Sequence, residues 1–215
     1  MKINNVFILG DSYSTFKGYI PEGQAIYYSE DDPCNTGVTK VSETWWYPLL
    51  SLLSANLVYN DSWSGSTICN TGYGGDCSKT SSFIYRLERH IENGFFEKNK
   101  VDTLFVFGGT NDAWANSPLG EIKFSDIKAE ELFSVLPAVS YLAKRLREAL
   151  ADVNVIVLIN TEIKEEIREG IRLCANHYGH RYIDFPYIEK VGSHPTPIGM
   201  KTIKDTVLDY IKANG

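Results

Sequence analysis

Ser12 has the best placement for covalent chemistry in this chain, because it follows an apolar run that ends abruptly. The run is VFIL at residues 6–9, and it stops at Gly10 and Asp11. Such a run is typical of a strand buried on both faces, and open α/β sheets carry their chemistry where the strands end. Ser12 is therefore a candidate nucleophile. The alternative is that Gly-Asp-Ser is only a turn, since these residues favour loops for conformational reasons.

Polar residues follow two further apolar runs in the same way. The run at residues 103–107 leads into GGTND, which contains Asn111, and residues 57–59 lead into NDSWSG, which ends at Gly65. Because the carboxyl ends of parallel strands share one edge of a sheet, we expect Asn111 and Gly65 to face Ser12. The alternatives are a helix N-cap at Asn111 and a simple turn at Gly65.

His194 is the candidate general base. It lies in the segment GSHPTP at residues 192–197, where prolines stiffen the loop ahead of the last predicted helix. A positioned imidazole can accept the proton of a hydroxyl nucleophile. Of the other histidines, His90 lies in a predicted helix, and His177 and His180 flank the loop before the last predicted strand.

The elements that position these residues follow an alternating pattern. Short apolar runs alternate with longer segments of helical period, which is typical of a parallel sheet wrapped by helices. The predicted strands are residues 3–9, 57–59, 103–107, 153–159 and 182–183, and the predicted helices include residues 130–150, 163–178 and 196–212. Pro137 should kink the first of these helices or mark its true start, because proline removes a helical hydrogen bond.

Two long segments, residues 13–43 and residues 62–80, fit no regular element. Both follow predicted strands, and long loops in compact domains are usually functional or disordered. We expect both to emerge at the sheet edge that carries Ser12 and to form the walls of a pocket.

The composition predicts one globular domain over residues 1–215. The chain has 215 residues, of which 43% are hydrophobic, and a net charge of −6. This length suits one domain with a full core, and no cationic stripe is present that would bind nucleic acid. No apolar stretch reaches the roughly 18 residues that cross a bilayer, and no signal peptide is evident. We therefore expect no nucleic acid or membrane partner and a cytoplasmic location.

The cysteines indicate neither a zinc ribbon nor a thioredoxin-type redox motif, because no C-x-x-C pair occurs. We expect free thiols, although Cys69 and Cys77 could pair in an oxidising compartment. The four cysteines are Cys34, Cys69, Cys77 and Cys174.

Four separated segments resemble the characteristic blocks of the SGNH hydrolases, also called the GDSL esterase and lipase family. They are Gly10–Ser12, Asn60–Gly65, Gly109–Asp112, and His194–Pro195 followed by Gly199. The blocks occur in the family's order and span nearly the whole chain, which makes the joint match far more specific than any one block. The resemblance implies an α/β fold of the flavodoxin-like type, a three-layer α/β/α sandwich with a five-stranded parallel sheet.

The resemblance also implies a role for each block in a serine hydrolase that acts on carboxylic esters without a metal or cofactor. Ser12 would be the nucleophile and His194 the base. The backbone amides of Ser12 and Gly65 and the side-chain amide of Asn111 would form the oxyanion hole. Ser12 would attack the ester carbonyl, an acyl-enzyme would form, and water would release the acid.

One position departs from the family's pattern. An aspartate normally precedes the histidine by three residues and orients its ring, but here that position is Val191. In serine proteases a faulty acid costs about ten-thousand-fold in turnover, so a substitute is needed. Glu189, Asp184 and a backbone carbonyl are the candidates, and we favour a Ser-His dyad supported by a carbonyl.

Aromatic residues near the predicted site are the only clue to the substrate. They can stack on sugar rings or simply pack in the core. Since no hydrophobic flap is evident, we predict a small-molecule or carbohydrate ester with a short acyl group such as acetyl, and not a long-chain lipid. The sequence leaves the oligomeric state open. The aromatic residues are Tyr13, Phe16, Tyr19, Tyr27, Tyr28, Trp45, Trp46, Trp63 and Trp114.

Two functions from other classes stay open at this level. A metal-dependent phosphoesterase could use Asp11, Asp61, Asn111, Asp112 and His194 as ligands, although the chain is short of histidines. A non-catalytic binding domain of the same fold is the second, and the missing aspartate favours it. A nucleotide-binding domain lacks support, since neither G-x-G-x-x-G nor G-x-x-x-x-G-K-S/T occurs.

Overall fold

A parallel sheet of five strands forms the centre of the computed structural model, which describes residues 2–214. Its order is β2-β1-β5-β6-β7, and every neighbouring pair is parallel. This is the order of a flavodoxin-like doubly wound sheet, as expected. The strands are β1 (Asn5–Gly10), β2 (Asn56–Ser62), β5 (Thr103–Phe107), β6 (Asn154–Ile159) and β7 (Arg181–Asp184).

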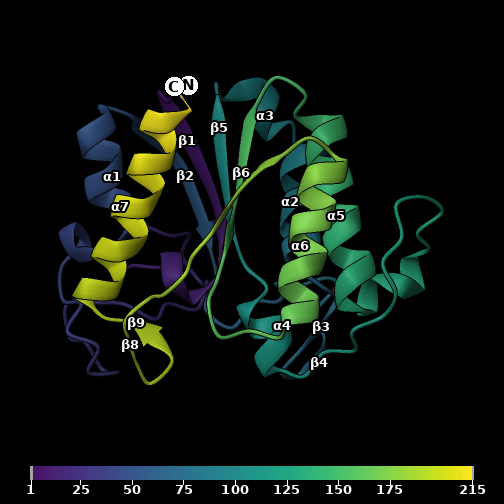
Figure 1. The fold of residues 1–215 in the computed structure, drawn as a ribbon, viewed down its shortest axis with the longest axis horizontal. Helices are drawn as coiled ribbons and strands as arrows, with labels where there is room; N and C mark the ends of the chain where they lie inside the picture. The colour runs from purple at the N-terminus through teal and green to yellow at the C-terminus, as the bar shows by residue number, and fades with distance from the viewer. Residues whose placement is uncertain (1, 215) are drawn as a thin grey trace.

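Helices cover both faces of the sheet and complete the predicted three layers. Helices α1 and α7 lie on one side, and α2, α5 and α6 lie on the other (Figure 1). None of the helices within residues 2–214 combines the length and apolar character that crossing a bilayer requires. The helices are α1 (Trp46–Leu53), α2 (Phe83–Glu92), α3 (Phe95–Lys98), α4 (Thr110–Trp114), α5 (Val135–Ala149), α6 (Glu165–His177) and α7 (Pro197–Ala213).

The apolar side chains of β1 belong to two separate hydrophobic clusters, one on each face of the sheet. Val6 and Ile8 pack with residues of α1 and α7, whereas Phe7 and Leu9 pack with residues of α2, α5 and α6. Successive side chains of a strand point to opposite faces, so a strand between two helical layers must be apolar throughout. This is why β1, an inner strand of the sheet between β2 and β5, is apolar from Val6 to Leu9.

The second strand is longer than predicted, because β2 extends through three polar residues that we placed after its end. Asn60, Asp61 and Ser62 pair with Ile8, Leu9 and Gly10 of β1. The polar side chains are tolerated in the strand because each has a buried partner; for example, the Asn60 amide donates to the Ser14 carbonyl at 2.9 Å.

The predicted helix at residues 130–150 is two elements. A 3₁₀ helix, η3 (Ala129–Phe133), precedes α5, and Pro137 lies in the first turn of α5. A proline fits there because the first-turn amides lack a helical acceptor anyway. Pro137 therefore marks the true start of the helix, which is one of the two outcomes that we predicted; the other was a kink. The predictions at residues 163–178 and 196–212 correspond to α6 and α7.

The two irregular segments lie at the carboxyl edge of the sheet, as expected. Residues 13–43 begin in η1 (Ser12–Ser14) and end near η2 (Val41–Glu43), and residues 62–80 contain the hairpin of β3 (Thr71–Gly72) and β4 (Gly75–Asp76). A second hairpin, β8 (Lys190–Val191) and β9 (His194–Pro195), lies at the same end of the molecule (Figure 1).

Candidate active site

Ser12 is presented by a tight turn at the end of β1. Asp11 caps η1 through its carboxylate, which accepts from the Tyr13 amide at 3.0 Å. The turn needs glycine at position 10, since a Cβ there would lie 2.5 Å from the Ser62 hydroxyl and 2.8 Å from the Ser14 Cβ. The Gly-Asp-Ser turn thus fixes the Ser12 hydroxyl at the edge of the sheet.

His194 reaches Ser12 from the opposite end of the chain. Its Nε2 lies 2.9 Å from the Ser12 Oγ. The hairpin that carries His194 is held from both sides, because the Tyr13 hydroxyl donates to the Ser193 carbonyl at 2.6 Å and the Tyr28 hydroxyl donates to the Pro195 carbonyl at 3.0 Å. The predicted nucleophile and the predicted base are therefore within hydrogen-bond reach.

A backbone carbonyl lies at the second nitrogen of the His194 ring. Nδ1 lies 3.3 Å from the Gly192 carbonyl oxygen. A carbonyl can only accept, so we assign the ring proton to Nδ1, which leaves the Nε2 lone pair for the Ser12 hydroxyl. This contact matches the carbonyl-supported dyad that we favoured from the sequence.

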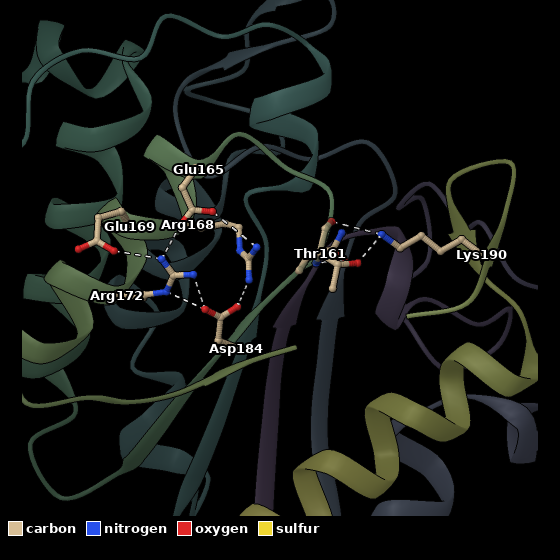
Figure 2. Close-up of polar contacts among 8 residues, drawn as sticks. Thr161, Glu165, Arg168, Glu169, Arg172, Asp184 and Lys190 are labelled. Carbon is tan, nitrogen blue, oxygen red and sulfur yellow. Dashed lines mark hydrogen bonds and ion pairs between the residues drawn. The ribbon is translucent and has the colours of Figure 1, made fainter. Parts of the chain in front are cut away.

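Neither acidic candidate contacts His194. The Asp184 carboxylate forms ion pairs with Arg168 and Arg172 of α6 (Figure 2). The Glu189 carboxylate accepts from the hydroxyl of Thr196, which caps α7. Both carboxylates thus stabilise the surrounding elements.

The start of α7 approaches the chain before His194 very closely. A Cβ at Gly199 would lie 2.0 Å from the Glu189 carbonyl oxygen. The Gly199 amide donates to the capping Thr196 hydroxyl at 3.2 Å. Gly199, which the sequence grouped with the histidine block, therefore allows the start of α7 to pack against the backbone of Glu189, just before the hairpin that carries His194.

The His194 ring is a neutral base. Burial lowers the pKa of His194 to about 4; the Gly192 carbonyl opposes this and the nearby Lys190 ammonium adds to it. Lys190 itself is held by the Thr161 side chain and backbone, with Nζ 2.9 Å from Oγ1 (Figure 2). At neutral pH the Nε2 lone pair is thus available to accept a proton.

Four of the aromatic side chains noted in the sequence have ring contacts with His194, namely Tyr13, Tyr27, Tyr28 and Trp114. Tyr27 stacks on it with ring centroids 3.5 Å apart and planes 8° apart, and Trp114 meets it edge-on at 5.7 Å. Trp63 lines a separate cavity, and Tyr19 packs against Phe16, Trp46 and Tyr47 at the surface. The buried ones are Tyr13, Phe16, Tyr28, Trp45 and Trp46.

The three predicted oxyanion donors lie in the segments that follow β1, β2 and β5, whose carboxyl ends share one edge of the sheet. Within residues 2–214 the backbone amides of Ser12 and Gly65 donate no hydrogen bond, and Gly65 adopts φ +80° in a turn closed from Ser66 to Trp63. The third donor, the amide of Asn111, lies in the first turn of α4, which Gly109 caps. The N-cap alternative for Asn111 is therefore wrong.

The orientation of Asn111 is fixed by two hydrogen bonds. Its Nδ2 donates to the Ser66 carbonyl at 3.0 Å, and its Oδ1 accepts from the Tyr73 hydroxyl at 3.1 Å. Tyr73 lies at the tip of the β3–β4 hairpin and carried no distinguishing signal in the sequence beyond its glycine-rich surroundings. The Ser66 carbonyl can only accept, so it sets which end of the Asn111 amide is the donor, and the Tyr73 hydroxyl then donates to the other end.

Arg86 is a further residue that the sequence does not distinguish. Its buried guanidinium donates to the Gly10 and Asp61 carbonyls and to the Ser66 hydroxyl, and pairs with the Asp61 carboxylate. It therefore ties the ends of β1 and β2 to the Gly65 turn. In the sequence Arg86 is one cation on an amphipathic helix, where solvent exposure is the common outcome.

The proposed metal ligands of the phosphoesterase alternative do not gather. No group of three or more His, Cys, Asp or Glu side chains within residues 2–214 is arranged to hold a metal ion. The Asp61 carboxylate is shared among Arg86, His90 and Gln24, and Asp112 accepts from the Ile68 and Cys69 amides. These carboxylates hold the loops around the site.

Asp11 differs from those carboxylates because its Oδ2 is buried and accepts no well-formed hydrogen bond from residues 2–214. Burial raises the pKa of Asp11 to about 7; the Tyr13 amide opposes this and the nearby Asp112 adds to it. Near neutral pH this carboxyl is therefore partly protonated.

The cysteines are unpaired among the described residues, including Cys69 and Cys77. Both are buried, and burial raises the pKa of each thiol.

Comparisons with known proteins match this geometry over nearly the whole chain. A family model described as GDSL-like lipase/acylhydrolase matches residues 4–211. A solved structure of a GDSL-like lipase from Bacteroides ovatus shares 35% identity and a TM-score of 0.89, over 99% of this chain and 100% of that one. A second, from Bacteroides uniformis, shares 35% identity and a TM-score of 0.88, over 98% of this chain and 96% of that one.

A more distant structure shares the fold. An acetyl xylan esterase from Butyrivibrio proteoclasticus has 15% identity and a TM-score of 0.63, over 100% of this chain and 64% of that one. No curated protein matches the chain.

Proposed function

Because this chain belongs to the GDSL-like lipase/acylhydrolase family and is a hydrolase that acts on ester bonds, we propose that Ser12 and His194 hydrolyse short-chain carboxylic esters. The acyl group that we propose is acetyl, and the alcohol is a carbohydrate or a small metabolite. The missing aspartate favoured a non-catalytic binding domain of the same fold, and membership of this hydrolase family favours an enzyme instead.

The observation that carries the proposal is the 2.9 Å contact between the Ser12 Oγ and the His194 Nε2. A hydroxyl becomes a nucleophile when an adjacent base takes its proton as it attacks. The lowered pKa of His194 keeps the ring neutral, so the base is ready at neutral pH. No other hydroxyl at the sheet edge has a hydrogen bond to an imidazole within residues 2–214.

The reaction that we propose has two halves. Ser12 attacks the ester carbonyl while His194 takes its proton, and the imidazolium then protonates the departing alcohol as the acyl-enzyme forms. Water attacks the acyl-enzyme with His194 again as base, and the acid leaves as Ser12 regains its proton. The charge on each tetrahedral oxygen would be met by the Ser12 and Gly65 amides and the Asn111 side chain.

The Gly192 carbonyl takes over one task of the missing aspartate in this scheme. It fixes the tautomer by accepting from Nδ1, at 3.3 Å. A carbonyl is a neutral acceptor, so it stabilises the imidazolium less than a carboxylate would. We therefore expect the dyad to act best on activated or unhindered esters such as acetates.

Two features support a carbohydrate alcohol. Trp114 and Tyr73 expose 36% and 58% of their surface beside His194 and Asn111, where an aromatic face can stack on a sugar ring. The fold is shared with an acetyl xylan esterase, and with a family two carbohydrate esterase from Clostridium thermocellum that was solved in complex with cellohexaose. These relatives motivate the choice of substrates for a test.

The test is a screen of p-nitrophenyl acetate, butyrate and octanoate together with acetylated xylo-oligosaccharides. We expect Ser12→Ala to lower kcat/KM by at least about a thousandfold, and acetate to exceed octanoate by at least about tenfold. Ser51→Ala, an exposed serine of α1, is the matched control. Full activity in Ser12→Ala would refute the proposal. A preference for octanoate over acetate would show that the substrate carries a long, lipid-like acyl group.

A chelator separates this reaction from metal-dependent hydrolysis. We expect the wild-type rate to be unchanged after incubation with EDTA, because Ser12 and His194 carry the proposed steps. Loss of activity that a divalent cation restores would favour the phosphoesterase alternative instead.

A further inference from the structure

The hydrogen bonds of His194 do not explain what keeps its ring from rotating about the bond between Cβ and the ring. Both hydrogen bonds of the ring, to Ser12 at 2.9 Å and to Gly192 at 3.3 Å, lie at its nitrogen atoms. Rotation about the bond that joins Cβ to the ring would break both contacts and replace nitrogen with carbon. The Gly192 contact is long and neutral, so it is a weak restraint compared with a carboxylate. Val191, at the usual acid position, is 48% exposed and cannot help.

Tyr27 supplies a restraint on the face of the ring. Its ring is nearly parallel to that of His194, with centroids 3.5 Å apart and an angle of 8° between the planes. Rotation of the imidazole would drive its edge into the Tyr27 ring. Trp114, Tyr13 and Tyr28 also lie near the imidazole, but each meets it at a steep angle and at 5.4 Å or more. Tyr27 is therefore the ring whose contact depends most on the imidazole plane.

Tyr27 is itself fixed to the segment that carries the nucleophile. Its backbone amide donates to the Thr15 hydroxyl at 3.0 Å, and that hydroxyl donates to the Ser12 carbonyl at 3.0 Å. The next residue, Tyr28, accepts from the Lys17 amide at 3.0 Å, and its hydroxyl holds the Pro195 carbonyl. One short segment thus contacts the turn of Ser12, the loop of His194 and the face of the imidazole.

We propose that Tyr27 is a positioning residue that holds the imidazole plane of His194 so that Nε2 stays aligned with the Ser12 hydroxyl. This is the orienting task that a carboxylate performs in serine triads. The proposal rests on the proposed function for its kinetic consequences. Its structural content, a stacked ring that fixes the plane of His194 and so keeps Nδ1 at the Gly192 carbonyl, can be measured without any substrate.

The kinetic experiment compares Tyr27→Leu with Tyr27→Phe. Phenylalanine keeps the stacked face, whereas leucine keeps apolar bulk and removes the flat ring. We expect Tyr27→Leu to lower kcat about 10- to 100-fold on p-nitrophenyl acetate, because a small misplacement of a reacting group has effects of this size. We expect KM to stay within about twofold and Tyr27→Phe to retain most of the activity. Tyr187→Leu, an exposed tyrosine without a ring contact to His194, is the control.

The spectroscopic experiment follows the imidazole nitrogens by ¹⁵N NMR. In wild type and in Tyr27→Phe we expect the shifts of one tautomer, with the proton on Nδ1. In Tyr27→Leu we expect a mixture of tautomers and a higher pKa for His194, because an uncovered ring is better hydrated. The Lys190 ammonium and the Gly192 carbonyl also act on this pKa, and the titratable side chains of Tyr13 and Tyr28 face the ring; all four residues are unchanged in the variants.

Three results would overturn the proposal. The first is a kcat for Tyr27→Leu within about twofold of wild type. The second is a change in KM alone, which would show that Tyr27 binds substrate. The third is an equal loss of kcat in Tyr27→Phe, which would assign the role to the hydroxyl. If the wild-type protein hydrolyses no ester in a Ser12-dependent way, the proposed function fails. The nitrogen shifts then still decide whether Tyr27 orients the ring.

Discussion

The imidazole of His194 lies 2.9 Å from the hydroxyl of Ser12, although 182 positions separate the two residues in the chain. Ser12 is fixed by the turn at the end of β1, and His194 by the hairpin before α7. The hydroxyls of Tyr13, in the turn after β1, and of Tyr28, in the loop that follows, donate to the carbonyls on either side of His194. The two reacting groups are thus aligned by contacts of the loops that carry them, and the missing acid leaves that alignment to neutral groups.

Removing either nearby carboxylate should leave catalysis intact. We expect Asp184→Asn and Glu189→Gln to keep kcat/KM within a few-fold of wild type, since Asp184 pairs with Arg168 and Arg172 and Glu189 accepts from Thr196. Asp184→Asn should lower the free energy of unfolding by about 1 kcal/mol, because partly exposed ion pairs contribute little. A loss of about a thousandfold in either variant would instead identify the orienting acid.

Asn111→Ala tests the side-chain donor of the oxyanion hole. We expect kcat to fall by about a hundred- to a thousandfold, which is the usual effect of removing one such donor. Asn176→Ala, an exposed asparagine of α6, is the control. If the rate in Asn111→Ala fell by less than about tenfold, Asn111 would have no role in binding the oxyanion.

Tyr73→Phe tests the contact that orients Asn111. The variant removes the hydroxyl that donates to Asn111 Oδ1 at 3.1 Å and keeps the exposed ring. Since a neutral hydrogen bond contributes about 1 kcal/mol, we expect kcat to fall about three- to tenfold with KM little changed. An increase in KM alone would show that the hydroxyl contacts substrate instead.

The pH dependence of kcat/KM should report the lowered pKa of His194. The neutral imidazole is the active form, so the rate falls as the pH drops through the pKa, and we expect the acid limb near pH 4. Lys190→Gln should move this limb to higher pH, because it removes a cation that disfavours the imidazolium. An acid limb near pH 6.5 in the wild-type enzyme would show that the ring is solvated.

Asp11→Asn should change how stability depends on pH. The Asp11 carboxyl has a pKa of about 7 in the folded protein and an ordinary value of 3.8. Between these values the folded state holds a proton that the unfolded chain has released, so this group's contribution to stability falls as the pH rises. Relative to the variant, which cannot titrate there, the unfolding free energy of the wild type should fall by on the order of 3 kcal/mol between pH 4 and pH 8. Urea unfolding at both pH values measures it, and a constant difference would contradict the raised pKa.

Local patterns in the sequence were enough to predict the layers of the fold. The apolar run of β1 indicated a strand covered on both faces. Helical periodicity located α6 and α7 to within two residues at each end, and α5 except for its start, which lies five residues later than predicted. The end of β2 was misplaced because a polar side chain signals a strand end only when it lacks a buried partner. Asp61 has such a partner in Arg86, which lies 25 residues further along the chain.

The sequence by itself determined which residues could react, because each signal is local. Ser12 lies in a Gly-Asp-Ser turn, Asn111 follows a pair of glycines, and His194 is next to prolines. Only the tertiary structure decided what surrounds the His194 ring. Glu189 and Asp184 are nearer to His194 in sequence than Tyr27 is, yet the start of α7 and the arginines of α6 take up their carboxylates. Tyr27 lies against the ring because its backbone is hydrogen-bonded to Thr15, which is in turn hydrogen-bonded to Ser12. Contacts of this kind depend on how distant segments pack, and spacing along the chain does not encode them.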